Sequence, residues 1–309
     1  MTADYQSILH QQASAGLAES SSDTHYLIPL PSYGVITVSG EEATGFLQNL
    51  LTNDVNQLTQ QTCQISAMCN PKGRLLALFL LIKTQESYQL VLPRSQCAFL
   101  AQRLQMFKLR SKVEVADSSE QLSVCALLGN APVDHAIPLT VPSSALLIHS
   151  AEQMGSRIEI LLDQEWQLAA EASWHISEIE AGIPLIVPES RELFTAQQVN
   201  LDLIGGVSFR KGCYPGQEVV ARLHYLGEPK RRLFHAVANK ADIPAVGETV
   251  NDKEGAVVGH IVRAVHGHDD QLLLQLSLKL EGTEQQLFLN DGTLLEQVQA
   301  SAPAREGLL

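Results

Sequence analysis

Alternation of apolar and polar residues predicts strands in the first third of the chain. Four strand-like runs are expected: GVITVSG from Tyr33, and residues 62–69, 74–83 and 87–92. Asn70-Pro71-Lys72-Gly73 is a strong turn signal between two of them. A helix near residues 94–107 and a strand at Lys112–Val115 complete a predicted β-β-β-α-β block.

A short helix is predicted directly after the first of these strands. Ser39 and Glu42 have the spacing of a capping box. The residues that follow share one helical face: Ala43, Phe46, Leu47, Leu50 and Leu51.

The middle of the chain contains both the alternation typical of strands and a segment expected to be helical. LSVCALLG (122–129) is expected to be a strand, and so is SRIEILLD (156–163). A helix is predicted from about Glu165 to Ala181, because Gly182 is a typical residue after a helix end and Pro184 follows it.

The sequence changes character after Glu228-Pro229. Residues 231–300 are short alternating runs divided by Gly, Asp and Asn, which predicts a small antiparallel barrel or sandwich. The fold class is therefore α+β. The expected divisions are a flexible extension at 1–23, two interleaved α+β modules at 24–228 and the β domain at 229–309.

Composition agrees with a chain of two or three domains in a soluble protein. The 309 residues are 45% hydrophobic and 18% charged. No run approaches the length of a membrane span, and the first 23 residues contain no lysine or arginine, unlike a secretory or transit peptide. Five cysteines at 63, 69, 97, 125 and 213 have no metal-finger spacing, which suits free thiols in a reducing cytoplasm.

Charge is distributed unevenly along the chain. The net charge of −13 argues against generic nucleic-acid binding. Residues 72–112, however, hold eight basic residues against one acid, and residues 210–232 hold six against two. Either these are solvated surface charges, or the two segments meet and attract an anion.

The most specific local signal is Lys211-Gly212-Cys213-Tyr214-Pro215-Gly216-Gln217-Glu218. Pro215-Gly216 has the order of a type II turn, which would display Cys213 at a bend. Glu218 then opens an apolar-patterned run, where the positive end of a helix dipole favours an acid. Lys211 could stabilise a thiolate. The alternative is a solvated turn before a short helix, with an inert cysteine.

The segment Phe194–Arg222, which contains this string, resembles the signature region of the YgfZ family, folate-binding proteins related to the aminomethyltransferase (T-protein) of the glycine cleavage system. The resemblance extends to Tyr33–Val55 and Glu180–Val187. It implies three domains around a central folate hole. It also implies tetrahydrofolate or a derivative as cofactor, and a role with iron–sulfur enzymes, including those that modify tRNA.

The same resemblance implies a set of folate-site residues. Trp174 stands where the family places a folate-contacting tryptophan, and Tyr33 stands where it has another tryptophan. Asp54 and Asn200 occupy motif positions and would hold the pterin edge or cap local turns. The remaining candidates come from the signature region: Lys211, Tyr214, Gln217, Glu218 and Arg222. Either aromatic side chain could instead be core packing.

Three functions remain open. The first is an accessory protein for maturation or repair of iron–sulfur enzymes, with Cys213 as a nucleophile or transient ligand. The second is a folate-dependent aminomethyl- or one-carbon transferase, and the third is a non-catalytic folate-sensing scaffold. Partners would be folate and iron–sulfur enzymes or assembly proteins, with direct tRNA contact undecided. No metal site is expected, because the one local histidine grouping, at residues 266–270, is typical of a polar turn.

Overall fold

The structure, a computed structural model, describes residues 5–19, 24–139, 141, 143–268, 271–281 and 285–301. The chain forms two compact units, each assembled from three separate segments. The first unit contains Met1–Leu47, Val55–Gln64 and Phe79–Trp174. The second contains Gln48–Asp54, Ile65–Leu78 and His175–Leu309. Segments of the two units therefore alternate along the sequence.

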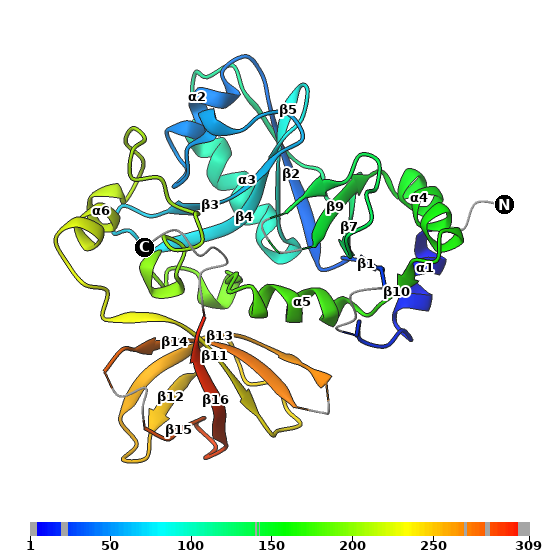
Figure 1. Ribbon diagram of the computed structural model, residues 1–309. Helices are drawn as coiled ribbons and strands as arrows, with labels where there is room; N and C mark the ends of the chain where they lie inside the picture. The colour runs from blue at the N-terminus through cyan, green and yellow to red at the C-terminus, as the bar shows by residue number, and fades with distance from the viewer. Residues whose placement is uncertain are drawn as a thin grey trace. The chain divides into compact units, whose positions relative to one another are not determined.

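One five-stranded sheet lies in the first unit, in the order β10-β1-β7-β9-β8. Its strands are β1 (Tyr26–Pro29), β7 (Ser123–Leu128), β8 (Ile137–Pro138), β9 (Ser144–His149) and β10 (Gln167–Leu168). Two helices, α1 (Tyr5–Gln12) and α4 (Ala151–Asp163), lie beside this sheet (Figure 1). Their apolar side chains pack into one core with those of β1, β7 and β9.

The prediction of a flexible extension at residues 1–23 is wrong for α1. Tyr5 and Ile8 are buried in the core of the first unit, and the Gln12 side-chain amide donates to the carbonyls of Pro29 and Ala169. These contacts with β1 and with residue 169 hold the helix in place. Residues 1–4 and 20–23 lie outside the described part of the chain.

The strand predicted at residues 156–163 is also wrong, because this segment is the C-terminal part of α4. Ser150 caps the helix by accepting a hydrogen bond from the Gln153 amide at 3.4 Å. Met154, Ile158 and Leu161 then fall on one buried face at helical spacing. A short apolar run does not distinguish strand from helix, and the deciding cap lies upstream of the run.

The helix predicted from residue 165 begins later, at Glu171. Helix α5 spans Glu171–Glu180, and the residues before it form β10, which pairs in parallel with β1. The predicted end is confirmed. Gly182 has φ 70°, and the amides of Gly182 and Ile183 bond to the carbonyls of Ile179 and Glu178.

A second five-stranded sheet has the order β3-β4-β5-β2-β6. Its strands are β2 (Tyr33–Ser39), β3 (Cys63–Cys69), β4 (Leu75–Lys83), β5 (Ser87–Pro93) and β6 (Glu114–Asp117), with helix α3 (Arg94–Lys108) after β5. This confirms the predicted β-β-β-α-β block. Helix α2 (Ala43–Gln48) is shorter than predicted, and the Glu42 carboxylate accepts from the Lys112 amide instead of forming a capping box.

The C-terminal strands close into an antiparallel barrel, in the order β11-β14-β13-β12-β15-β16 (Figure 1). They are β11 (Arg231–Ala238), β12 (Thr249–Asp252), β13 (Val257–His266), β14 (Leu272–Lys279), β15 (Leu287–Phe288) and β16 (Leu294–Ala300). Alternate side chains of β14, from Leu272 to Leu278, fill the barrel core. The α+β class and the C-terminal barrel are thus confirmed.

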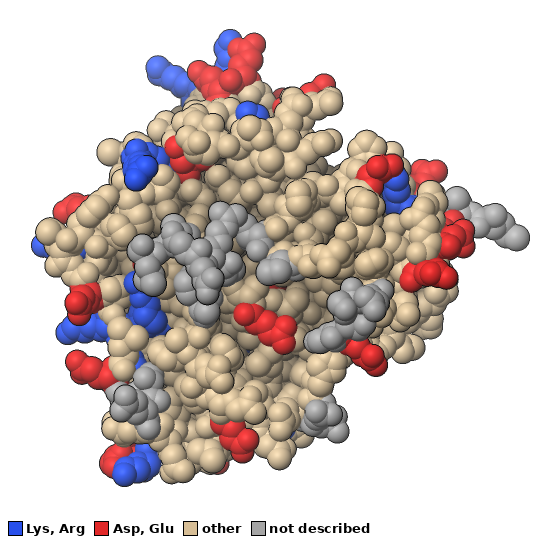
Figure 2. Space-filling model, viewed as in Figure 1, with Lys and Arg blue, Asp and Glu red and all other residues tan. Residues whose placement is uncertain are grey.

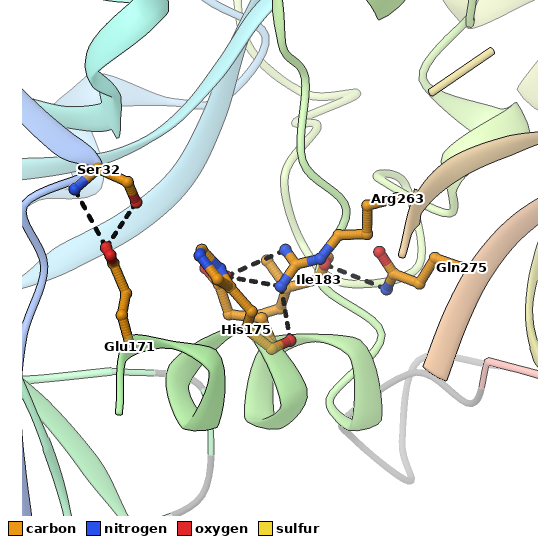
Figure 3. Close-up of polar contacts among 7 residues, drawn as sticks. Ser32, Glu171, His175, Ile183, Arg263 and Gln275 are labelled. Atoms are coloured by element: carbon orange, nitrogen blue, oxygen red, sulfur yellow. Dashed lines mark hydrogen bonds and ion pairs between the residues drawn. The ribbon is translucent and has the colours of Figure 1, made fainter. Parts of the chain in front are cut away.

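A buried ion pair joins the second half of α5 to this barrel (Figure 3). The Arg263 guanidinium on β13 donates to the Glu178 carboxylate at 3.0 and 3.1 Å, and both side chains are 6% exposed. Arg263 also donates to the His175 carbonyl, and the Gln275 amide donates to the Ile183 carbonyl. Polar contacts therefore set the position of the helix end on the barrel wall.

We expect Glu178→Ala alone to lower the free energy of unfolding by about 3–5 kcal/mol, because it leaves the Arg263 charge buried without its carboxylate. The double variant Glu178→Leu, Arg263→Met removes both charges and should recover most of that loss. Urea denaturation followed by circular dichroism measures both values. A single variant as stable as the wild type would contradict this interpretation.

Candidate functional site

The signature loop, residues 211–217, adopts the predicted type II turn. Gly216 has φ 83° and ψ 0°, and the Gln217 amide donates to the Tyr214 carbonyl at 3.1 Å. Helix α6 (Gln217–Tyr225) starts immediately afterwards with Glu218 in its first turn. The Cys213 side chain is exposed on the loop before this turn.

A second turn packs directly against the first. The Gly73 amide donates to the Asn70 carbonyl, which closes the predicted turn between β3 and β4. A Cβ atom at Gly216 would lie 2.4 Å from the Asn70 carbonyl oxygen and 2.8 Å from Gly73 Cα. Only glycine allows this approach of two backbones with φ positive at position 216.

Lys211 anchors the signature loop from within. Its ammonium group donates to the carbonyl oxygens of Gln48 (2.6 Å), Leu51 (2.5 Å) and Asn53 (3.1 Å). These bonds take all three N–H groups. Lys211 therefore ties the loop to residues 48–53, and its N–H groups do not serve the Cys213 thiolate as the sequence suggested.

Burial around this anchor changes the pKa values of two side chains, Lys211 and Tyr214. Desolvation lowers the pKa of Lys211 to about 8, and the negative charge of Asp54 opposes that shift. Desolvation raises the pKa of the Tyr214 hydroxyl, with a further contribution from Cys69. The Lys211 ammonium lies 5.2 Å from the centre of the Tyr214 ring, within range of a cation–π contact.

Two further residues, which the sequence did not single out, bind the segment that accepts the Lys211 hydrogen bonds to neighbouring backbone. The Thr52 hydroxyl donates to the Gly206 carbonyl at 2.7 Å and accepts from the Ala67 amide at 3.0 Å. The Asn53 amide donates to the carbonyls of Ile65 and Gly205. The available signal was the polar run Thr52-Asn53-Asp54 directly after an apolar face.

The five thiols have different surroundings. Burial raises the pKa of Cys69 and Cys125 to about 12, and that of Cys63 and Cys97 to about 11. Cys125 in β7 and Cys97 in α3 are core residues. Cys213 is the exposed thiol of the set. Since reactivity requires access and a thiolate, the four others are poor nucleophiles.

Most of the predicted site residues belong to the second unit. Gln217, Glu218 and Arg222 lie on α6, and Asp54 accepts a hydrogen bond from Gln48, whose carbonyl binds Lys211.

Asn200 is buried, and its amide group bonds to the backbone of Leu233 and Ser301. The Asn200 side chain thus bonds to the barrel backbone, which differs from the local turn cap that the sequence offered as an alternative.

The two aromatic candidates belong to the first unit and are buried. Trp174 on α5 is 1% exposed, and Tyr33 at the start of β2 is 7% exposed. Both side chains therefore contribute to core packing in this structure. A role for either as a folate-stacking surface stays a prediction.

The described residues contain neither a metal-ligand cluster nor a membrane-spanning helix. Within them, no three His, Cys, Asp or Glu side chains gather as ligands of one metal ion, and Asp269 and Asp270 of the predicted polar turn lie outside them. No described helix is both long and apolar enough to span a membrane. On the face drawn in Figure 2, basic side chains are dispersed with acidic ones among them.

Comparison with known proteins identifies relatives along most of the chain. Residues 21–140 match the family model of the GCVT N-terminal domain. A "tRNA-modifying protein YgfZ" from Colwellia psychrerythraea is 30% identical over 284 residues, which cover 83% of this chain and 86% of the relative. A protein of the same name from an Enterobacter species is 28% identical, covering 81% of this chain and 84% of the relative.

A solved structure shares the fold. The glycine cleavage system aminomethyltransferase T from Bartonella henselae superposes with a TM-score of 0.68 at 15% identity. The match covers 97% of this chain and 90% of that protein. The three-sheet architecture, two α+β modules with a C-terminal barrel, is thus the T-protein fold, as the signature segment implied.

The contact between the two turns predicts that Gly216→Ala destabilises the protein by about 3 kcal/mol, from positive φ and from the backbone clash together. Gly205→Ala is the matched control. Gly205 has φ 76°, and a Cβ atom added there would have no heavy atom within 4 Å, so only the strain of about 1 kcal/mol applies. Urea denaturation of both variants checks the difference, and equal losses would contradict the close approach.

The Lys211 anchor predicts a pH dependence of stability. Below about pH 8 Lys211 is charged in the folded and in the unfolded protein, and the folded protein bears the full cost of desolvating the ammonium group. Between about pH 8 and 10.5 the folded lysine loses its proton while the unfolded one retains it. The free energy of unfolding contributed by this residue therefore rises with pH across that window. Urea denaturation of wild type and Lys211→Met should show the rise only in the wild type; parallel profiles would refute it.

Proposed function

The chain belongs to the YgfZ family, and on that premise we propose that it is a folate-binding accessory protein for iron–sulfur enzymes. It would support maturation or repair of these enzymes, including ones that modify tRNA. The name of the relatives, a tRNA-modifying protein, supports the tRNA context. The reducing cytoplasm is the compartment in which an exposed thiol of this kind persists.

The observation that carries the proposal is the exposed Cys213, on a loop with backbone contacts on both sides. Lys211 holds one side of the loop through three carbonyls, and the turn at Gly216 holds the other. A thiol that is fixed in position and open to solvent can attack an electrophile or bind iron transiently, because thiolate is both a nucleophile and a soft ligand.

Several residues near the loop suit a reduced folate, which supplies a carrier for one-carbon units when bound. The Arg222 guanidinium is exposed on α6 and would bind the glutamate tail. Asp54 is a partly buried carboxylate that would accept hydrogen bonds from the pterin edge. Gln217 and Glu218 at the start of α6 offer further polar contacts.

A transferase is the second candidate, because the chain has the fold of an aminomethyltransferase. The exposed cysteine favours the accessory role, since a folate-dependent aminomethyl transfer needs no thiol from the protein. Formation of methylenetetrahydrofolate from an aminomethyl-lipoyl donor would establish the transferase instead.

The proposal predicts that Cys213→Ala abolishes support of iron–sulfur enzyme activity in cells and leaves tetrahydrofolate binding intact. Anaerobic calorimetry should give saturable tetrahydrofolate binding for the wild type and for Cys213→Ala. Arg222→Gln should weaken that binding about tenfold by removing a charge-assisted hydrogen bond to a carboxylate.

Arg110→Gln is the matched control, since Arg110 is an exposed arginine outside the candidate site. It should bind tetrahydrofolate as the wild type does. Trp174→Ala is unsuitable here, because truncating a side chain that is 1% exposed damages the core. A Cys213→Ala strain with unimpaired iron–sulfur enzymes would disprove the role of the thiol, and a wild type without tetrahydrofolate binding would disprove the role of folate.

A further inference from the structure

Three aromatic rings form a cluster where the signature region meets the end of α6. Phe209 and His224 stack with ring centres 3.7 Å apart and planes inclined by 10°. Tyr225 meets both rings edge-on, at 6.0 Å from Phe209 and 4.8 Å from His224. The cluster joins the segment before Lys211 to the last turn of the helix.

This cluster is open to solvent. Tyr225 is 64% exposed and its neighbour Leu226 is 84% exposed. The Tyr225 ring plane is inclined by 74° to Phe209 and by 78° to His224, and the exposed fraction shows that much of the residue's surface remains uncovered. Exposed aromatic side chains held in a fixed orientation are typical of recognition surfaces.

Basic residues lie next to the cluster in the sequence and in a cleft beside the same helix, although the whole chain carries a net charge of −13. Arg210 follows Phe209 and is exposed, and Arg222 lies three residues before Tyr225, on the same side of the helix. Leu223 of the same helix lines a cleft of about 1130 Å³ that also contains Lys230, Arg231 and Lys279. Glu228 and Glu281 are the acidic residues of its lining.

Two of these cations lie at paired positions of neighbouring strands. Arg231 on β11 and Lys279 on β14 are partners in the antiparallel register, and the Lys279 ammonium donates to the Val257 carbonyl on β13, the other neighbour of β14. Lys230 adds a third positive charge beside them. A bound polyanion would be attracted by all three of these positive charges.

We propose that the Phe209–His224–Tyr225 cluster and the adjoining cleft bind single-stranded RNA. An unpaired base stacks on the exposed surface of Tyr225, and Arg210, Lys230, Arg231 and Lys279 neutralise the phosphates on either side. Aromatic rings flanked by cations are the chemistry that binds unpaired nucleotides, because every base offers a π face and every linkage a charge. A protein partner would use the same apolar surface but would not need the cations.

The test is fluorescence anisotropy with a fluorescein-labelled oligoadenylate of about ten nucleotides, at about 50 mM salt and without folate. Tyr225→Ala should weaken binding about tenfold, and Tyr225→Phe, which keeps the ring, should bind within about twofold of the wild type. Ile243→Ala removes an exposed apolar side chain elsewhere and should leave the affinity unchanged.

Salt provides a second measurement. Arg210→Gln and Lys230→Gln should each reduce the slope of log affinity against log salt by about 0.7, the value for one contact to a single strand. A duplex of the same length should compete weakly, since its base faces are covered. Because folate is absent, failure of this test would leave the folate proposal intact, and failure of folate binding would not affect this one.

Three results would overturn the proposal. The first is equal affinity of Tyr225→Ala and wild type for the oligonucleotide. The second is equal binding of the duplex and the single strand. The third is a wild type that does not bind the oligonucleotide but self-associates, with the self-association lost in Leu226→Ser. The last result would make the cluster an interface between copies of the chain.

Discussion

The Lys211 ammonium and the three carbonyl oxygens that receive it are the constraint on which the candidate site depends. A buried ammonium must have hydrogen-bond acceptors, and residues 48–53 provide them from the backbone of a segment far away in sequence. The loop that carries Cys213 is thereby joined to residues 48–53 of the same unit. The same burial lowers the pKa of Lys211 to about 8, so the anchor combines tight hydrogen bonding with a charge that is costly to keep.

Around this anchor, each neighbouring feature restricts the loop further. The turn at Gly216 packs on the turn at Gly73 so closely that a side chain at Gly216 would meet backbone. Thr52 and Asn53 bind Gly205 and Gly206 just before the loop. The result is an exposed thiol on a backbone with little freedom, which is the arrangement that a nucleophile or a transient metal ligand requires. The aromatic cluster that we propose to bind RNA lies at the far end of α6.

Prediction from sequence succeeded where local patterns have one physical meaning. The Pro215-Gly216 turn, the glycine after α5 and the strands of the barrel follow from backbone preferences and period-two alternation, and all are present. It failed at residues 156–163 because a short apolar run fits both periodicities and the Ser150 cap lay outside it. The distinction between Trp174 as core and Trp174 as binding surface depends on burial, which no local pattern reports.

The sequence by itself determined the fold class, the displayed cysteine and the family, because these depend on periodicity, turn chemistry and a long specific motif. Only the tertiary structure decided what the polar side chains do. Lys211 suggested a partner for the thiolate, yet it binds carbonyls about 160 residues away in the chain. Asn200 binds the barrel backbone, and Phe209 stacks on His224. Hydrogen bonds and ring contacts form with whatever folding brings within a few ångströms, so their partners are set by the packing of distant segments.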